Sequence, residues 1–100
     1  MILALSPSPS LDVTYEVAEL RRGDITRPLR TTRVAGGKAL NVARVAHTLG
    51  ADVQVVAALG GHTGAWIVDL LAADGIAATV VPIERTTRIS SAIVETASGA

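Results

Sequence analysis

Between residues 36 and 83 the chain alternates helical patterns with short apolar runs, and glycines stand at most of the junctions. The order is a helical pattern at 38–49, an apolar run at 53–59, a helical pattern at 63–73 and an apolar run at 78–83. Gly50 and Gly75 are placed to end the two helices. Strands that alternate with helices at this spacing predict βαβ units and a parallel sheet. The fold class predicted from this pattern is therefore α/β.

Each helical pattern carries an apolar stripe at the spacing of an amphipathic helix. In the first helix the stripe comprises Val42, Val45, Ala46 and Leu49. In the second helix the predicted buried residues are Ile67, Leu70 and Leu71. Thr63 is the expected N-cap of the second helix, because a threonine hydroxyl can accept a bond from a free backbone N–H.

The segments before and after this region do not fit the alternation. Residues 2–5 predict a buried strand that ends at Pro7, residues 12–17 a second strand, and residues 21–24 a turn. Residues 25–34 are polar and weakly alternating, which favours an exposed strand outside the main sheet. Residues 89–96 predict another strand, and residues 97–100 have the composition of a turn. Because this pattern predicts the start of a hairpin, we expect the chain to be a piece of a longer protein.

Composition excludes several classes of function. Nine basic and nine acidic residues give a net charge of zero, which argues against a general nucleic-acid binder. The absence of cysteine rules out disulfides and thiolate metal sites. No window reaches the ~20 apolar residues of a membrane span, and the N-terminus lacks the pattern of a secretory signal. A soluble protein of the cytoplasm is the default expectation, with one small domain in its 100 residues.

The residues most suited to chemistry are Gly36-Gly37-Lys38 and Asn41, at the start of the first helix. Glycines let a ligand approach the backbone, and the first turn of a helix leaves N–H groups free for anions or electron-rich oxygens. A lysine adds positive charge, and an asparagine both donates and accepts hydrogen bonds. A sugar hydroxyl or a phosphate would suit this site. The simpler interpretation is a plain strand-to-helix turn with a solvated lysine. The segment is not a Walker A loop, since Thr32 replaces the first glycine.

The longer context resembles the pfkB (ribokinase-like) family of carbohydrate kinases, and within it the 1-phosphofructokinase and tagatose-6-phosphate kinase branch. Three stretches carry the resemblance: residues 5–15, residues 35–60 and Thr87-Arg88-Ile89. The matching positions in the second stretch are Gly36, Gly37, Asn41, Ala43, Gly50 and Gly60. Ser8 and Ala39 depart from the residues usual in the family, which bears on substrate preference more than on fold.

The resemblance implies a Rossmann-like, three-layer α/β fold of the ribokinase type with a small β-sheet lid. Residues 1–100 would be the N-terminal part of one kinase domain, with lid segments at approximately 12–34 and 88–100. In many relatives the lid also pairs with a second subunit. The resemblance therefore implies a homodimer formed through the lid.

It also implies roles for individual residues in binding the substrate. Asp12 would accept hydrogen bonds from two sugar hydroxyls, and Asn41 would bind another hydroxyl. Gly36 and Gly37 would present backbone N–H groups to the sugar. The phosphate already on the substrate would be held by Lys38 and Arg88, since a guanidinium suits phosphate geometry. Ser90 occupies a position where relatives often carry asparagine. Each of these residues could instead be an ordinary turn, cap or solvated residue.

The implied activity is ATP-dependent phosphorylation of a sugar phosphate, with ATP and Mg²⁺ as cofactors. Fructose 1-phosphate is the first substrate expected, with tagatose 6-phosphate or fructose 6-phosphate as other candidates. The family's catalytic aspartate lies in a Gly-Ala-Gly-Asp motif that these 100 residues lack. No catalytic residue and no metal ligand is therefore assigned here, and this chain alone is expected not to transfer phosphoryl groups. Two alternatives stay open: a ribokinase-like kinase of an unphosphorylated sugar or nucleoside, and a non-catalytic sugar-phosphate-binding module.

Overall fold

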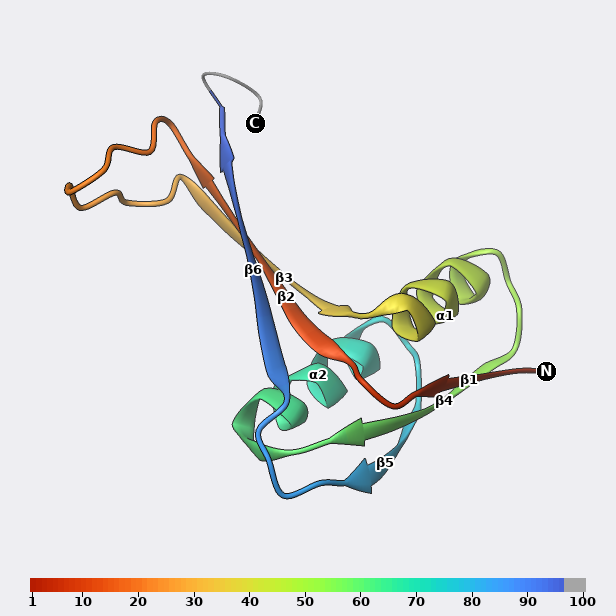
Figure 1. The fold of residues 1–100 in the computed structure, drawn as a ribbon. Helices are drawn as coiled ribbons and strands as arrows, with labels where there is room; N and C mark the ends of the chain where they lie inside the picture. Colours follow the sequence, from red (N-terminus) through yellow and green to blue (C-terminus); the bar gives the residue numbers. More distant parts are fainter. Residues whose placement is uncertain (97–100) are drawn as a thin grey trace.

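The computed structural model describes residues 1–96, which form six strands and two helices. Their order is β1 (Ile2–Ser6), β2 (Ser10–Val17), β3 (Arg30–Gly36), α1 (Lys38–Thr48), β4 (Val53–Leu59), α2 (Gly61–Ala73), β5 (Ala78–Pro82) and β6 (Arg88–Glu95). The strands form two separate three-stranded sheets, in the orders β1-β4-β5 and β3-β2-β6. Figure 1 shows the second sheet projecting away from the body of the molecule.

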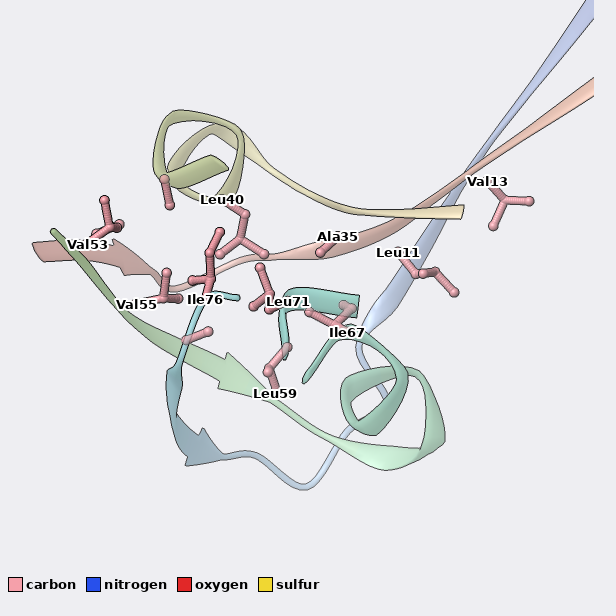
Figure 2. Close-up of a cluster of buried hydrophobic side chains, with 13 residues drawn as sticks. Leu11, Val13, Ala35, Leu40, Val53, Val55, Leu59, Ile67, Leu71 and Ile76 are labelled. Carbon is pink, nitrogen blue, oxygen red and sulfur yellow. The ribbon is translucent and has the colours of Figure 1, made fainter. Parts of the chain in front are cut away.

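The first sheet is parallel throughout, so the predicted βαβ organisation is confirmed. Ala4 of β1 pairs with Val55 of β4, which in turn pairs with Ala78 of β5. Alternate residues of β4 are buried because they face the two helices, as Figure 2 shows for Val53, Val55 and Leu59. These strand residues pack with Ile67 of α2 in one core built almost entirely from aliphatic side chains.

The second sheet, which we call the projecting sheet, consists of β2, β3 and β6. β2 lies in its centre, antiparallel to β3 and parallel to β6. Leu11 and Val13 of β2 are buried in the same core as the helices, so the base of the projecting sheet is packed onto the body. The Asp12–Val34 stretch therefore lies outside the main sheet, as its departure from the alternation predicted.

The predicted strand at 25–34 is wrong in its first half, because β3 begins only at Arg30. Pro28 has no N–H to donate to a neighbouring strand, which disfavours a ladder there. The backbone N–H of Leu29 donates to the carbonyl of Glu16 at 2.7 Å, and regular pairing starts with the next residue. The turn at 21–24 is present, with a bond from the N–H of Asp24 to the carbonyl of Arg21. The predicted turn at 97–100 lies outside the described residues.

Both helices end where their glycines predicted. After α1, Gly50 adopts a φ of 90°, and the N–H of Ala51 donates to the carbonyl of Ala46. This is a Schellman ending, which satisfies carbonyls that the helix leaves free. The start of α2 differs from the prediction, because the helix begins at Gly61 and its N-cap is Gly60. Thr63 is not a cap and is buried inside the first turn.

The predicted buried stripe of α1 is also largely wrong. Val42, Val45 and Leu49 are 60%, 61% and 81% exposed, whereas Leu40 and Ala43 are fully buried. The helix has a second apolar stripe of smaller width, and this one faces the sheet because alanine lets the helix approach the strands closely. Ala46 borders both stripes and packs against the core. In α2 the prediction holds better, since Ile67 and Leu71 are buried and Leu70 packs against the core.

Candidate functional site

The candidate site lies where the carboxyl ends of the parallel strands meet the base of the projecting sheet. In open α/β sheets ligands bind at this edge of the strands. A pocket of about 110 Å³ opens there between the segments that follow β1 and β5. Its lining residues are Pro7, Ser8, Pro9, Ala58, Ile83, Arg85, Thr86, Thr87 and Arg88. The pocket is therefore bordered by cationic and hydroxyl groups at the edge expected to bind ligands.

The register of the projecting sheet places several predicted site residues on one face. Ser10 of β2 pairs with Arg88 of β6 on one side and with Gly36 of β3 on the other. Asp12 pairs with Ser90 in the same way. Because paired residues in neighbouring strands project from the same face, and successive residues alternate, these five positions share a face. A carboxylate and a guanidinium thus lie on the same face of neighbouring strands, two residues apart in register.

One neighbour orients the Asp12 carboxylate, and another leaves space for it. The Ser10 hydroxyl donates to Oδ1 of Asp12 at 2.6 Å. A Cβ atom on Gly36 would lie well under 3.0 Å from the Asp12 carboxylate, so only glycine leaves room for that group. The Asp12 side chain is half-buried and, when ionised, it only accepts hydrogen bonds. It has lone pairs left for the hydroxyl groups of a ligand.

The start of α1 supplies the second half of the site. Gly37 is the N-cap, with a φ of 102° that favours glycine, and no side chain caps the first turn. The first N–H groups of a helix have no acceptor within the helix, and so they suit a ligand oxygen. Lys38 is the first residue of α1 and is exposed. Asn41 completes the first turn, where its own N–H donates to the carbonyl of Gly37.

Arg88 stands at the start of β6 and is anchored by its surroundings. Its Nη2 donates to the carbonyl of Ser8 at 3.2 Å. The preceding residue, Thr87, is buried and exchanges two bonds with Gly60, one through each backbone N–H. Gly60 N–H donates to the Thr87 hydroxyl at 2.9 Å, and Thr87 N–H donates to the Gly60 carbonyl at 3.0 Å. The loop that carries Arg88 is thereby fixed to the end of β4.

Sequence reasoning did not assign three residues that support the site. Ser10 stands two residues before Asp12, a spacing that puts both side chains on one face of a strand. Arg44 stands three residues after Asn41, a spacing at which helix side chains meet, and it donates to Asn41. For the supporting bond of Thr87 no local signal existed, because its partner Gly60 is 27 positions away in the chain.

Residues 1–96 contain no group of three or more His, Cys, Asp or Glu side chains arranged to hold a metal ion. In this described part of the chain, neither helix has the length and apolar character needed to cross a bilayer.

Comparison with known proteins gives the family. The model of the pfkB family carbohydrate kinases matches residues 9–100. The chain belongs to this family. It is 40% identical over 95 residues to the 1-phosphofructokinase of Haloferax volcanii, and the match covers 94% of this chain and 31% of that protein.

Solved structures of pfkB family members have the same fold. Phosphofructokinase-2 from Escherichia coli, crystallised with fructose-6-phosphate, matches with a TM-score of 0.90 at 29% identity, over 99% of this chain and 33% of that one. A possible 1-phosphofructokinase from Thermotoga maritima matches with a TM-score of 0.84 at 25% identity, over 95% and 31% of the two chains. The chain therefore has the ribokinase-like α/β fold of these kinases and spans about a third of their length.

Proposed function

We propose that this chain is the sugar-phosphate-binding part of an ATP-dependent sugar-phosphate kinase. One observation carries the proposal: the register that puts Asp12 and Arg88 on the same face of neighbouring strands. A carboxylate is suited to donors such as sugar hydroxyls, whereas a guanidinium is suited to phosphate. A ligand that satisfies both groups carries hydroxyls and a phosphate on one small molecule. A sugar phosphate has this chemistry.

Within the site the remaining residues have separate tasks. Gly36 and Gly37 bring the backbone close to the sugar, and Asn41 binds a further hydroxyl. Lys38 joins Arg88 at the phosphate, and Ser90 stands beside Asp12 in the register. Together these contacts orient the substrate, which is the main contribution that proteins make to phosphoryl transfer. The projecting sheet is proposed to act as the lid over this substrate, through the segments at 12–34 and 88–100.

ATP with Mg²⁺ is the proposed phosphoryl donor. The residues that the structure describes offer no ligand set for Mg²⁺. The catalytic aspartate that removes the proton from the acceptor hydroxyl is proposed to lie outside these 100 residues, with most of the ATP site.

Fructose 1-phosphate is the proposed substrate, supported by the 40% identity to a protein named 1-phosphofructokinase. Fructose 6-phosphate is the ligand named for one structural neighbour, and tagatose 6-phosphate could use the same contacts. The alternative within the kinases is an unphosphorylated sugar or nucleoside. It is favoured less, because it would leave the Arg88 guanidinium without a phosphate to bind. A non-catalytic sugar-phosphate-binding module is the alternative outside the kinases.

The experiment is an ADP-release assay on the full-length protein that contains this segment, with fructose 1-phosphate, fructose 6-phosphate, tagatose 6-phosphate and ribose compared. We expect turnover of one phosphorylated sugar, and a raised KM for it in Arg88→Ala and Lys38→Ala with a smaller change in kcat. Turnover of ribose alone would move the protein to the unphosphorylated-sugar kinases. Binding of a sugar phosphate without turnover would favour the binding module.

The proposed assembly is a homodimer that pairs through the projecting sheet. Large aliphatic side chains of this sheet and its tip are half or more exposed in the described residues: Ile25, Leu29, Ile89 and Ile93. Exposed apolar side chains that gather on one part of a surface favour burial against a partner. Light scattering of the full-length protein would test this, with a monomer as the result that contradicts it.

A further inference from the structure

The side chain of Arg44 connects the two halves of the glycine turn that opens the candidate site. Arg44 lies on α1, half-buried, and its two terminal nitrogens have different acceptors. Nη2 donates to Oδ1 of Asn41 at 2.7 Å, and Nη1 donates to the backbone carbonyl of Ala35. Ala35 is in β3, just before Gly36 and Gly37, while Asn41 lies in the first turn of α1. One guanidinium therefore holds both the strand that enters the turn and the helix that leaves it.

The bond to Asn41 determines which hydrogen-bonding group of that residue is free. A guanidinium has donors only, so the atom of Asn41 that faces it must be the carbonyl oxygen. The amide nitrogen then points away from Arg44 with two hydrogens to donate. Within residues 1–96, Arg44 is the partner found for the Asn41 side chain, whose surface is exposed. Asn41 can therefore offer a ligand donors, and the ligand group that binds it must accept.

The bond to Ala35 fixes where this donor stands. Ala35 is buried and pairs with Leu11, so its carbonyl belongs to a rigid part of the projecting sheet. Gly36 pairs with Ser10, but glycine permits many backbone conformations, so the angle of the turn through Gly36 and Gly37 would be less constrained without Arg44. A charged donor shared between two acceptors adds a constraint on that angle.

We propose that Arg44 is a positioning residue of the sugar site: it orients the Asn41 amide so that its NH₂ group donates to a sugar hydroxyl oxygen. Arg44 itself does not touch the substrate in this arrangement. The inference rests on the proposed function, because it assigns a ligand hydroxyl to Asn41. It adds that the Asn41 NH₂ group is the donor in that contact and that Arg44 orients this donor.

The experiment measures steady-state kinetics of the full-length kinase with the phosphorylated sugar that it turns over. Arg44→Met keeps much of the side-chain length and removes both hydrogen bonds. We expect its KM for the sugar phosphate to rise on the order of tenfold, as for the loss of a charge-assisted bond, with the KM for ATP unchanged. Gln54→Met is the control, because Gln54 is exposed on β4 and lies outside both the candidate site and the proposed lid, and it should leave both constants unchanged.

Two further variants separate positioning from a general effect on folding. Asn41→Asp is nearly isosteric and keeps an oxygen for Arg44 but loses the NH₂ donor; it should raise the sugar KM at an unchanged melting temperature. In an Asn41→Ala background, Arg44→Met should add little further effect, because the residue that it positions is gone. A full Arg44→Met effect in that background, or an Asn41→Asp enzyme with the wild-type KM, would overturn the inference.

The wild-type protein is measured first, so that a failure of the proposed function can be told apart from a failure of the role proposed for Arg44. Absence of turnover or binding with every sugar overturns the proposed function and this inference with it. Turnover with a sugar KM that Arg44→Met leaves unchanged overturns the role of Arg44 alone.

Discussion

The Asp12 carboxylate occupies the space in which a side chain at position 36 would lie. A Cβ atom built on Gly36 would stand well under 3.0 Å from all three atoms of that carboxylate group. The φ of Gly36 is not positive, so glycine is needed here for space and not for backbone conformation. The glycine thus lets β3 pass beside the Asp12 carboxylate at the base of the projecting sheet.

Replacement of Gly36 by alanine should therefore affect binding more than stability. The atoms in the way belong to the end of a short side chain, which can rotate aside. We expect the free energy of unfolding to fall by about 1 kcal/mol or less. The KM for the sugar phosphate should rise at least about tenfold, because Asp12 would no longer face the sugar. Kinetics and chemical denaturation of the full-length protein would measure both. A variant with normal KM would show that Asp12 does not bind the sugar.

Asp12→Asn tests the carboxylate itself with almost no change in shape. The Ser10 hydroxyl can still donate to the amide oxygen, but the second oxygen becomes an NH₂ group that cannot accept from a sugar hydroxyl. Loss of one bond to a charged group predicts a fall in kcat/KM of about 10- to 100-fold.

Ser10→Ala serves as the companion to this variant. It leaves both carboxylate oxygens in place and removes only the donor that orients one of them. Its loss in kcat/KM should be smaller than that of Asp12→Asn. An equal or larger loss in Ser10→Ala would mean that orientation of the carboxylate matters more than its charge.

The sequence predicted the elements of the body well, because apolar runs and the glycines that end helices and strands are local signals. β4 agrees with its predicted range, and both helices end at their glycines. The buried face of α1 was predicted wrongly, because periodicity alone ranks Val42, Val45 and Leu49 above a stripe that contains Ala43. Which stripe faces the sheet depends on how closely the helix can approach the strands, which is a tertiary property.

The candidate site was predicted mainly through resemblance to the family. The elementary chemistry of Gly36-Gly37-Lys38 allowed a phosphate, a sugar or a plain turn. The decisive feature is the pairing of β2 with β6, which brings Arg88 next to Ser10 across 78 positions of the chain, from 10 to 88. Pairing between distant strands is not encoded in any local pattern. The hydrogen bonds between Thr87 and Gly60 could not be predicted from the sequence for the same reason.

Gly60→Ala should act on stability, in contrast to Gly36→Ala. A Cβ on Gly60 would stand under 3.0 Å from the backbone carbonyl oxygens of Ile83 and Arg85, which cannot rotate aside. Relief requires the 83–87 loop to shift, which would also weaken the bonds to Thr87. We expect a loss of about 1–3 kcal/mol, as for other overpacked sites.

Gly23→Ala is the control for that variant. Gly23 has a φ of 83° but open space around its Cα, so alanine should cost about 1 kcal/mol through backbone strain alone. Urea denaturation of both variants makes the comparison. If Gly60→Ala proved no more destabilising than Gly23→Ala, the tight fit of the 83–87 loop on β4 would be wrong.

Trp66 should report on the position of the projecting sheet. The Arg33 guanidinium of β3 lies 4.9 Å from the centre of the Trp66 ring on α2, a cation–π contact between that sheet and the body. Arg33→Met should shift the emission of Trp66, the only tryptophan in these 100 residues, and lower stability by about 0.5–1 kcal/mol.

If the projecting sheet closes over a bound sugar phosphate, the contact between Arg33 and Trp66 changes and the emission shifts when the sugar phosphate is titrated in. The same titration of Arg33→Met should give a smaller shift. An identical shift in both proteins would mean that the signal arises elsewhere, and no shift in either would argue that the sheet keeps its position when the sugar binds.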